Sequence, residues 1–568
     1  MNVLSQLVLL LLECKSFAEI TMRNAILFFV IVAQIFAQFG NQYSGGPILP
    51  EQAAYDVKFY EIDLKINPDK KFISGSTLID VEVTNSINSL VFHLDTVFNV
   101  EKVLINEKES EFIHKDGLIK TDIKNTNMGD VVSAKIFYSG HPREAQRAPW
   151  EDGFVWAKTA DSSHWVGVTC QGGGADIWFP CKDHPSDEPD SVSIKITAPA
   201  NLVCASNGVM LSEEINKEGW KTTHWFTSNP INNYNVNITL APFKKISRTF
   251  RSIAGEKFPV EFYVLPESYD TAKIFTKQFL EHLSFYEKYC GPYPFRADKY
   301  GIAETPYLGM EHQTIIAYGN GYKNNEFGFD WLHHHELAHE WWGNLITAKD
   351  WRDFWIHEGI GTYMQALYAE ELDGLEGLKK YMKTFRMMNT KPILPDGSVS
   401  SNDAYHPDIY YKGAWFVHTL RYYLGDKVFF KILKRWAYPT EELEKTTDGS
   451  QCRLVTTEDL IQQAEEISGK DLEWLFYTYL KNAKLPELAA VLIEKDYENE
   501  LRLKWNMPDN SIFEMPVEVQ LGNEIKTLEM KKGETAVKFN PMLEPKIDPN
   551  NWIAKQKVKI EKYSKRGF

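Results

Sequence analysis

The hydrophobic pattern changes its period twice along this chain, and this change limits the folds that the chain can adopt. From about Asp56 to Phe250 hydrophobic and polar residues alternate, as in "YDVKFYEIDLKI" and "STLIDVEV". From Asp270 to roughly Ala483 hydrophobic residues recur at helical spacing, as in "TAKIFTKQFLEHLSFYEKYCG". Beyond Leu485 the alternation returns in "MPVEVQLGNEIKTLEM". Alternation predicts strands and the helical spacing predicts helices, so the order is β, then α, then β.

A chain of 568 residues is too long for a single hydrophobic core. We therefore predict a multidomain α+β protein with an N-terminal mostly-β domain, a mainly α central domain and a small C-terminal β-sandwich. The expected divisions are a leader at 1–37 and domains at 38–250, 251–484 and 485–568.

The leader contains a pattern typical of a secretory signal peptide. The stretch "MRNAILFFVIVAQIFA", from Met22 to Ala37, has a basic Arg23, an apolar run and a small residue where cleavage needs one. The apolar run is too short for a membrane span, and no later segment approaches 18 apolar residues. We expect an exported protein, periplasmic or secreted, with no stable span in the mature chain. The alternative is a cytosolic protein with an apolar N-terminal helix.

Charge and cysteine content exclude two other classes of protein. A formal net charge of −15 argues against nucleic-acid binding, which needs clustered Lys and Arg to neutralise phosphates. Five cysteines lie beyond the leader, and this odd, sparse set does not indicate a disulfide framework. The hydrophobic core must therefore stabilise the fold.

The segment "HHHELAHEWWGN" contains a candidate metal site. On a helix, His335 and His339 lie on one face with Cβ atoms about 5 to 6 Å apart, and Glu336 lies beside them. A catalytic zinc takes three protein ligands, and Glu358, with eighteen residues between it and His339, is the natural third one. The alternative is that these histidines lie on a buried helix without a metal. For His333 and His334 a surface or packing role is the preferred interpretation.

Several motifs together resemble one family. "HELAHEWWGN" followed by "WIHEG" at this spacing is similar to the gluzincin aminopeptidases of peptidase family M1, the family of aminopeptidase N and leukotriene hydrolase. "YLGMEHQT" resembles the G-x-M-E-N exopeptidase motif of that family, and "YYKGAWFVHTLR" resembles its tyrosine-bearing helix. "TCQGGGADIWFPCKDHP" resembles the segment with its glutamine and F-P-C-x-D-x-P signature. The resemblance runs from about Tyr55 to the C-terminal sandwich.

The resemblance implies a thermolysin-like central catalytic domain with one Zn²⁺ per chain, held by His335, His339 and Glu358. A bound zinc lowers the pKa of its water to about 7 and polarises a carbonyl group, as peptide hydrolysis requires. Glu336 is implied as the general base. By likeness to the Y-x-K-G motif Tyr410 is implied as the oxyanion donor, with Tyr411 as the alternative if the motif is shifted by one residue.

The resemblance also implies that the chain is an exopeptidase, a zinc metallo-aminopeptidase acting on peptides with a free N-terminus. Glu311 is expected to bind the α-ammonium group with help from Gln171, and Gly309 and Met310 belong to the same substrate-binding segment.

Two histidines depart from the family pattern. His312 follows the glutamate and His357 precedes the third ligand, where the family has asparagine. We expect zinc binding to survive, with a shift in substrate preference or pH response because histidine titrates near neutrality.

Three alternatives remain open on the sequence alone. A zinc endopeptidase is favoured if Glu311 points away from the cleft, and an epoxide-hydrolase-like activity requires a lipid channel. An inactive homologue acting as a peptide-binding module is the alternative from a different class.

Overall fold

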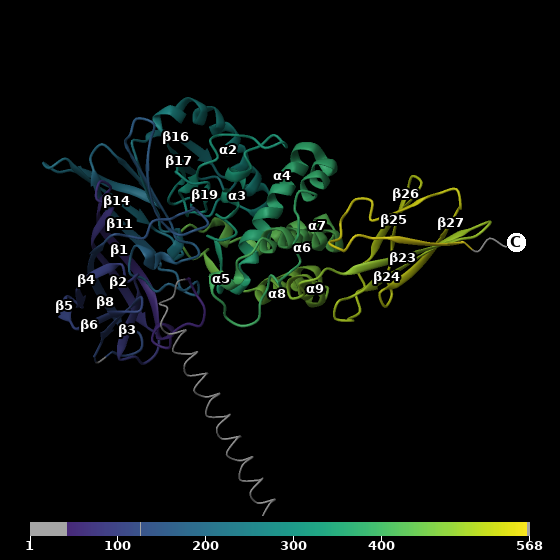
Figure 1. Ribbon diagram of the computed structural model, residues 1–568, viewed down its shortest axis with the longest axis horizontal. Coiled ribbons are helices and arrows are strands. Elements are labelled where there is room, and N and C mark those ends of the chain that lie inside the picture. Colours follow the sequence, from purple (N-terminus) through teal and green to yellow (C-terminus); the bar gives the residue numbers. More distant parts are fainter. Residues whose placement is uncertain (1–42, 125, 565–568) are drawn as a thin grey trace, which may run out of the picture.

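The structure is a computed structural model that describes residues 43–124 and 126–564, and the expected leader therefore lies outside the described residues. Figure 1 shows three parts in line along the long axis: a β-rich part, a largely helical part and a C-terminal pair of sheets. The predicted fold class, β, then mainly α, then β, is confirmed.

The N-terminal part is built on a mixed eight-stranded sheet. Its central strand β1 (Tyr55–Asn67) pairs parallel with β11 (Ser191–Pro199) and antiparallel with β2 (Phe72–Val83). Alternate side chains of β1 are buried, as its sequence predicts. The remaining strands are β13 (Val209–Ile215), β14 (Trp220–Thr227), β8 (Val131–Gly140), β4 (Phe98–Ile105) and β5 (Lys108–Ser110).

Two smaller sheets complete this part of the molecule. One has four strands, β12 (Val203–Ser206), β15 (Ile238–Ala241), β10 (His164–Thr169) and β9 (Gly153–Lys158). The other has three, β3 (Ser89–His93), β7 (Leu118–Asp122) and β6 (Phe112–Lys115). The loop that follows β10 carries Gln171 toward the central part.

The central part begins with a five-stranded sheet. In spatial order its strands are β16 (Lys244–Arg251), β17 (Lys257–Val264), β18 (Tyr300–Glu304), β20 (Ile316–Tyr318) and β19 (Gly309–Met310). Strands β16 and β17 pair as an antiparallel hairpin, so this sheet starts before the expected division at residue 250. Strand β19 is an edge strand, and the residues just after it enter the site.

Helices make up most of the rest of the central part. Helix α2 ends at Cys290, and its C-cap residue Gly291 donates its N–H to the Glu287 carbonyl. A capping box of Thr456 and Asp459 begins α8. The helices are α2 (Tyr269–Cys290), α3 (Trp331–Ala338), α4 (Trp355–Met382), α5 (Ser401–Ala404), α6 (Asp408–Leu424), α7 (Asp426–Ala437), α8 (Thr457–Ser468) and α9 (Glu473–Leu480). Among the described residues, no helix combines the length and the hydrophobicity that a membrane crossing requires.

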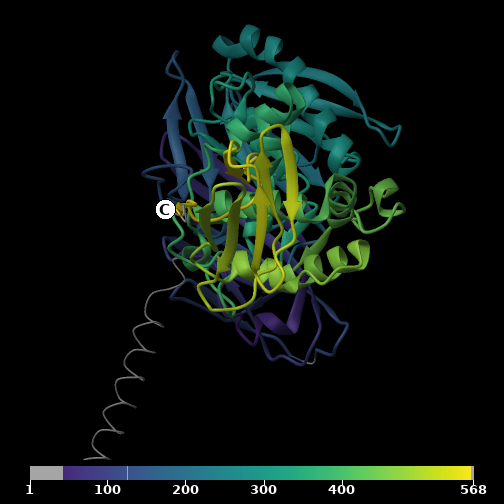
Figure 2. The ribbon, with the colours of Figure 1, turned by 90° about the vertical axis from the view of Figure 1, so that its right-hand side faces the viewer.

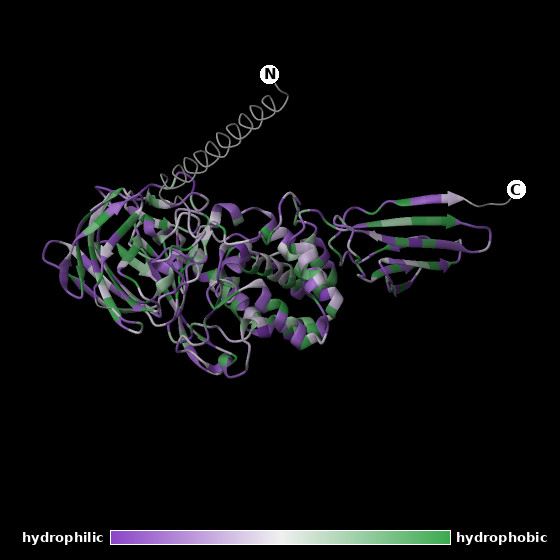
Figure 3. Ribbon diagram, turned by 90° about the horizontal axis from the view of Figure 1, so that it is seen from below, coloured by the Kyte–Doolittle hydropathy of each residue, from purple (hydrophilic) through white to green (hydrophobic). Residues whose placement is uncertain are grey.

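The C-terminal sheets extend away from the helices (Figures 1 and 3), and Figure 2 shows them in front of the central part. The Trp552 ring stacks on His418 of α6, with ring centroids 4.7 Å apart, and joins the sandwich to the helices. One sheet contains β27 (Glu534–Phe539), β24 (Asn499–Asn506), β23 (Glu487–Glu494) and β29 (Ile560–Ser564), and the other contains β26 (Glu524–Leu528), β25 (Val517–Leu521) and β28 (Pro545–Ile547).

Candidate active site

Helix α3 presents the two candidate imidazole ligands. Its first turn is fixed by Asp330, whose side chain accepts a hydrogen bond from the His333 N–H at 3.1 Å. His335 lies in the last turn and His339 caps the helix, so both rings are on one side. Their Nε2 atoms are 3.3 Å apart. The predicted i, i+4 pair is therefore formed.

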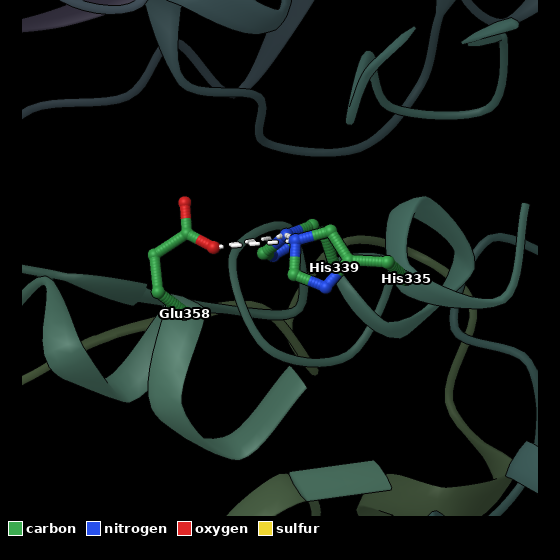
Figure 4. A group of neighbouring side chains, drawn as sticks. All are labelled: His335, His339 and Glu358. Carbon is green, nitrogen blue, oxygen red and sulfur yellow. Dashed lines mark hydrogen bonds and ion pairs between the residues drawn. The ribbon is translucent and has the colours of Figure 1, made fainter. Parts of the chain in front are cut away.

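Glu358, in the first turn of α4, faces the same point (Figure 4). Its Oε2 lies 3.4 Å from His335 Nε2 and 3.6 Å from His339 Nε2. Zinc binds such donors at about 2.1 Å, which places two ligands of a tetrahedral ion about 3.4 Å apart. The three donor atoms thus have the separations that a single zinc ion requires.

The protonation states of these groups also fit a cation. Burial lowers the pKa of His335 to about 4, so its ring is neutral near pH 7. The His339 Nδ1 lies 3.0 Å from the Trp342 carbonyl oxygen, and a proton on Nδ1 leaves the lone pair of Nε2 directed at Glu358. Glu358 Oε2 is buried and has no hydrogen-bond partner among the described residues. The unpaired Glu358 oxygen and the two converging ring nitrogens are donors of the kind that a metal ion binds.

Close contact between α4 and α6 fixes Glu358 relative to Tyr410. The helices cross at Gly359 and Gly413, where a Cβ added to either residue would lie 2.7 to 2.8 Å from the Cα of the other. Glu358 and Tyr410 lie beside this crossing. Any larger residue at the crossing would separate the third ligand from the tyrosine.

The structure separates the two candidate tyrosines. The Tyr410 ring centroid lies 6.0 Å from that of His335, and its hydroxyl lies 2.5 Å from the Tyr405 hydroxyl. Tyr411 instead stacks on Phe385, with centroids 5.7 Å apart, at the outer part of the cleft. Tyr405 also lines the cleft.

A hydrogen-bond network holds Glu311. Its Oε1 accepts hydrogen bonds from Gln171 Nε2 and from the Tyr234 hydroxyl, the latter at 3.0 Å. The Asn344 side chain donates to the Glu311 carbonyl oxygen at 3.1 Å. Burial raises the pKa of the Glu311 carboxyl, and the nearby His339 opposes this shift. Glu311 and Gln171 are therefore brought together, whereas Tyr234 lacks any local spacing signal that would have predicted it.

These groups line a cleft of about 820 Å³ between the N-terminal and central parts. Gly309, Met310 and Glu336 all line it, and a Cβ added to Gly309 would lie 2.8 Å from Glu336 Oε1. Burial raises the pKa of Glu336 well above its usual value, and Glu311 and Glu358 raise it further. All predicted site residues contribute to this cleft: Gln171, Gly309, Met310, Glu311, His335, Glu336, His339, Glu358 and Tyr410.

The four other histidines of interest are all buried and packed. His333 stacks on Phe279 at 3.7 Å between centroids, and His334 contacts Tyr286, so both have the expected packing role. The expectation that His312 and His357 alter the pH response is wrong. Burial lowers the pKa of His312 to about 3 and that of His357 well below its usual value, so neither gains a proton near neutrality. His357 Nε2 instead accepts a hydrogen bond from the Ala348 N–H at 2.8 Å.

Residues 43–46, here called the N-terminal strap, join the two walls of the cleft. The Ser44 N–H donates to the Gly172 carbonyl at 2.9 Å, and the Ser44 carbonyl accepts from the Ser401 N–H at 2.9 Å. Trp351 Nε1 donates to Ser44 Oγ at 3.3 Å. Nothing in the sequence of the strap indicated this role, because its partners are more than a hundred residues away.

Comparison with known proteins follows the same division of the chain. The family profile described as "Peptidase M1 N-terminal domain" matches residues 56–234, and "Peptidase family M1 domain" matches residues 278–479. Aminopeptidase M1-C of Oryza sativa subsp. japonica is 23% identical over 510 residues, which cover 81% of this chain and 53% of that protein. The chain thus spans about half the length of the curated relatives it matches.

Solved structures show the same fold. An M1 zinc metallopeptidase mutant from Deinococcus radiodurans, bound to a Tyr-Ser-Ala substrate, has a TM-score of 0.62 and 21% identity, covering 77% of this chain and 97% of that one. Legionella pneumophila aminopeptidase A, in complex with aspartic acid, has a TM-score of 0.72 and 17% identity, covering 89% of this chain and 60% of that one. Because the two family profiles together match more than half of the sequence, in the expected order, the chain belongs to peptidase family M1.

Proposed function

We propose that this chain is a zinc aminopeptidase that releases the N-terminal residue of peptides. One observation carries the proposal: a carboxylate oxygen of Glu311, a carboxylate oxygen of Glu336 and a ring nitrogen of His339 all lie within 4.8 Å of one another. An α-ammonium group bound at Glu311 then has the first peptide bond of the substrate next to the general base. A substrate with further residues before the cleaved bond would collide with the buried Glu311 side chain.

The charges in the cleft support the same function. Glu311, Glu336 and Glu358 are buried carboxyl groups whose pKa burial raises. Among the described residues that line the cleft, Arg147 is the one lysine or arginine, and its side chain is 70% exposed. Buried carboxylates need compensating positive charge. A divalent cation at Glu358 and the α-ammonium group of a substrate at Glu311 supply it.

In the proposed mechanism each residue has one role. His335, His339 and Glu358 would hold a zinc ion, which would supply an acidified water and polarise the substrate carbonyl. Glu336 accepts a proton from that water and then delivers it to the leaving amine. The Tyr410 hydroxyl donates a hydrogen bond to the oxygen that becomes negative as the carbonyl is attacked.

The alternatives have less support. An endopeptidase is favoured by a Glu311 that points away from the cleft, but Glu311 lines the cleft and accepts hydrogen bonds there. An inactive peptide-binding homologue is favoured by a missing ligand or base, but His335, Glu336 and Glu358 are all in place. Of the cleft-lining residues in the described part of the chain, none specifically indicates an epoxide substrate.

Blocking the N-terminus of the substrate tests the proposal. We expect the purified protein to cleave leucyl 4-nitroanilide but not its N-acetyl form, because the acetyl group removes the ammonium charge that Glu311 binds. Glu311→Gln should lower kcat/KM for the substrate with a free N-terminus. The kcat/KM values of the free and the N-acetyl substrate should therefore differ less in this variant than in the wild type. Equal cleavage of both substrates by the wild-type protein would contradict the exopeptidase function.

Metal removal provides the second part of this test. Dialysis against a chelator should abolish cleavage, and zinc should restore it. Elemental analysis should find one zinc per chain in the wild type and less in Glu358→Gln, which keeps the size of the side chain but loses its charge. A protein that remains active without a metal would contradict the proposal.

We also propose that the protein is exported by an N-terminal signal peptide. The support is the sequence of residues 22–37, which lies outside the described residues. N-terminal sequencing of the exported protein should give a start near residue 38, and a cell-associated protein that begins at Met1 or Met22 would contradict the proposal.

The N-terminal strap provides a matched pair of variants. A Cβ on Gly45 would lie 2.2 Å from Trp351 Cδ1, and the Trp351 ring is 6.0 Å from that of Tyr234, which donates to Glu311. Misplacing a substrate group by about 1 Å can cost about 10²-fold in rate. We expect Gly45→Ala to lower kcat/KM for leucyl 4-nitroanilide by up to about 10²-fold, mainly by raising KM.

Gly46→Ala is the control for this prediction. Gly45 and Gly46 have similar positive φ angles, +78° and +83°, so both substitutions carry a similar backbone strain. A Cβ on Gly46, however, has no neighbour within 4 Å. Equal effects of the two variants would show that backbone strain alone, and not displacement of Trp351, explains the loss.

A further inference from the structure

Asp152 is a carboxylate in the cleft that the mechanism above does not use. It lines the cleft together with Gln171 and Glu311. Its Oδ2 accepts a hydrogen bond from the Gly173 N–H at 2.6 Å, which fixes the side chain against the loop after β10. Burial raises its pKa to about 6, so the group is ionised at pH 8. Asp152 is therefore a fixed negative charge that faces the substrate space.

Asp152 lies close to the site proposed for the α-ammonium group. Gln171 donates to Glu311, and Gly173, which holds Asp152, is two positions further along the chain. Gly172, which lies between them, is close to the same carboxylate: a Cβ added there would lie 3.1 Å from Asp152 Oδ2. A first residue bound at Glu311 needs a long, flexible side chain to reach past Gln171 to Asp152, and lysine and arginine have such a side chain.

Among the described residues no lysine or arginine forms an ion pair with Asp152, although the charge of Arg143 lowers its pKa. Arg143 is paired with Asp95, with Nη2 and Oδ2 2.5 Å apart. Arg147 is paired with Glu151 at 3.6 Å on the exposed rim. Asp152 is partly buried, and a charge held partly out of water without a partner is costly, so a cation brought by the ligand gains a charge-assisted contact there.

An aromatic side chain lines the same cleft as Asp152. Trp150 lines the same cleft two positions before Asp152 and is 58% exposed. A large exposed indole in the same cleft as a carboxylate suits the flat face of a guanidinium group or the stem of a lysine. A small or acidic side chain would use neither group.

We propose that Asp152 is a specificity-determining residue that selects lysine or arginine as the first residue of the substrate. The inference rests on the aminopeptidase function proposed above. Glu311 binds the α-ammonium group, whereas Asp152 binds the cationic end of the side chain and Trp150 covers its stem.

Arginyl and citrullyl 4-nitroanilides test this inference, because the two side chains have nearly the same shape and differ in charge. A hydrogen bond to a charged group is worth about ten- to a hundredfold in affinity. At pH 8 the wild-type protein should therefore show a kcat/KM for arginyl substrate at least about tenfold above that for citrullyl substrate. In Asp152→Asn, which keeps an acceptor for the Gly173 N–H, this ratio should fall by a similar factor.

Glu151→Gln is the matched control, since it removes the same charge from the neighbouring residue, which does not line the cleft. It should keep the arginyl-to-citrullyl ratio of the wild type. A wild-type ratio near one, or an unchanged ratio in Asp152→Asn, would overturn the assignment. If neither substrate is cleaved, the proposed aminopeptidase function is wrong, and calorimetry with argininamide and citrullinamide tests the role of Asp152 separately. Tighter binding of argininamide that is lost in Asp152→Asn would support this role. Equal binding of the two amides would overturn it.

Discussion

Glu336→Gln is expected to lower kcat by about 10²- to 10⁴-fold, the contribution of a positioned general base. The amide cannot accept the proton of the attacking water, although it fills the same space. Glu336 is not one of the three residues that converge as ligands, so the variant should still bind one zinc per chain. The measurements are kcat with leucyl 4-nitroanilide and the zinc content of the same sample.

The burial of Glu336 makes this substitution informative. Its carboxyl pKa is raised well above the usual value by burial and by Glu311 and Glu358, so it holds a proton more readily than an exposed glutamate. Glutamine, being neutral, should not destabilise the site. Glu326→Gln removes the same charge from an exposed loop ten positions earlier and should leave kcat unchanged. Full activity in Glu336→Gln would show that another group accepts the proton.

The sequence could predict the parts of the site that follow from local geometry. His335 and His339 are four residues apart on a predicted helix, and such a pair must lie on one face. Glu358 followed from the need for a third ligand together with the family spacing. The order of β and α parts followed from the hydrophobic period, because burial on one face of an element imposes that period.

Other parts of the site depend on contacts between distant segments, which have no signature in sequence spacing. Tyr234 reaches Glu311 across 77 positions, and Ser44 of the strap contacts Trp351 across 307. Asp152 is another example, because its side chain is fixed in the cleft by the Gly173 N–H of the distant loop after β10. The error over His312 and His357 has the same origin, because the pKa of a histidine depends on burial, which tertiary structure determines.

Tyr410→Phe is expected to lower kcat by about 10²- to 10³-fold with little change in KM, as found when one oxyanion donor is removed. The hydroxyl acts on charge that is present in the transition state but absent from the bound substrate, so its loss should affect kcat. The position of the ring should not change, because α6 is fixed against α4 at the contact of Gly413 with Gly359. Steady-state kinetics with leucyl 4-nitroanilide measure both constants.

Tyr411→Phe decides between the two tyrosines. Tyr411 stacks on Phe385, and phenylalanine can keep that stacking, so this variant should retain nearly full kcat. Tyr405→Phe should give a smaller loss than Tyr410→Phe, because it removes only the hydroxyl that lies 2.5 Å from that of Tyr410 and orients it. A large loss in Tyr411→Phe with normal activity in Tyr410→Phe would place the oxyanion donor one residue later and would require α6 to turn relative to the ligands.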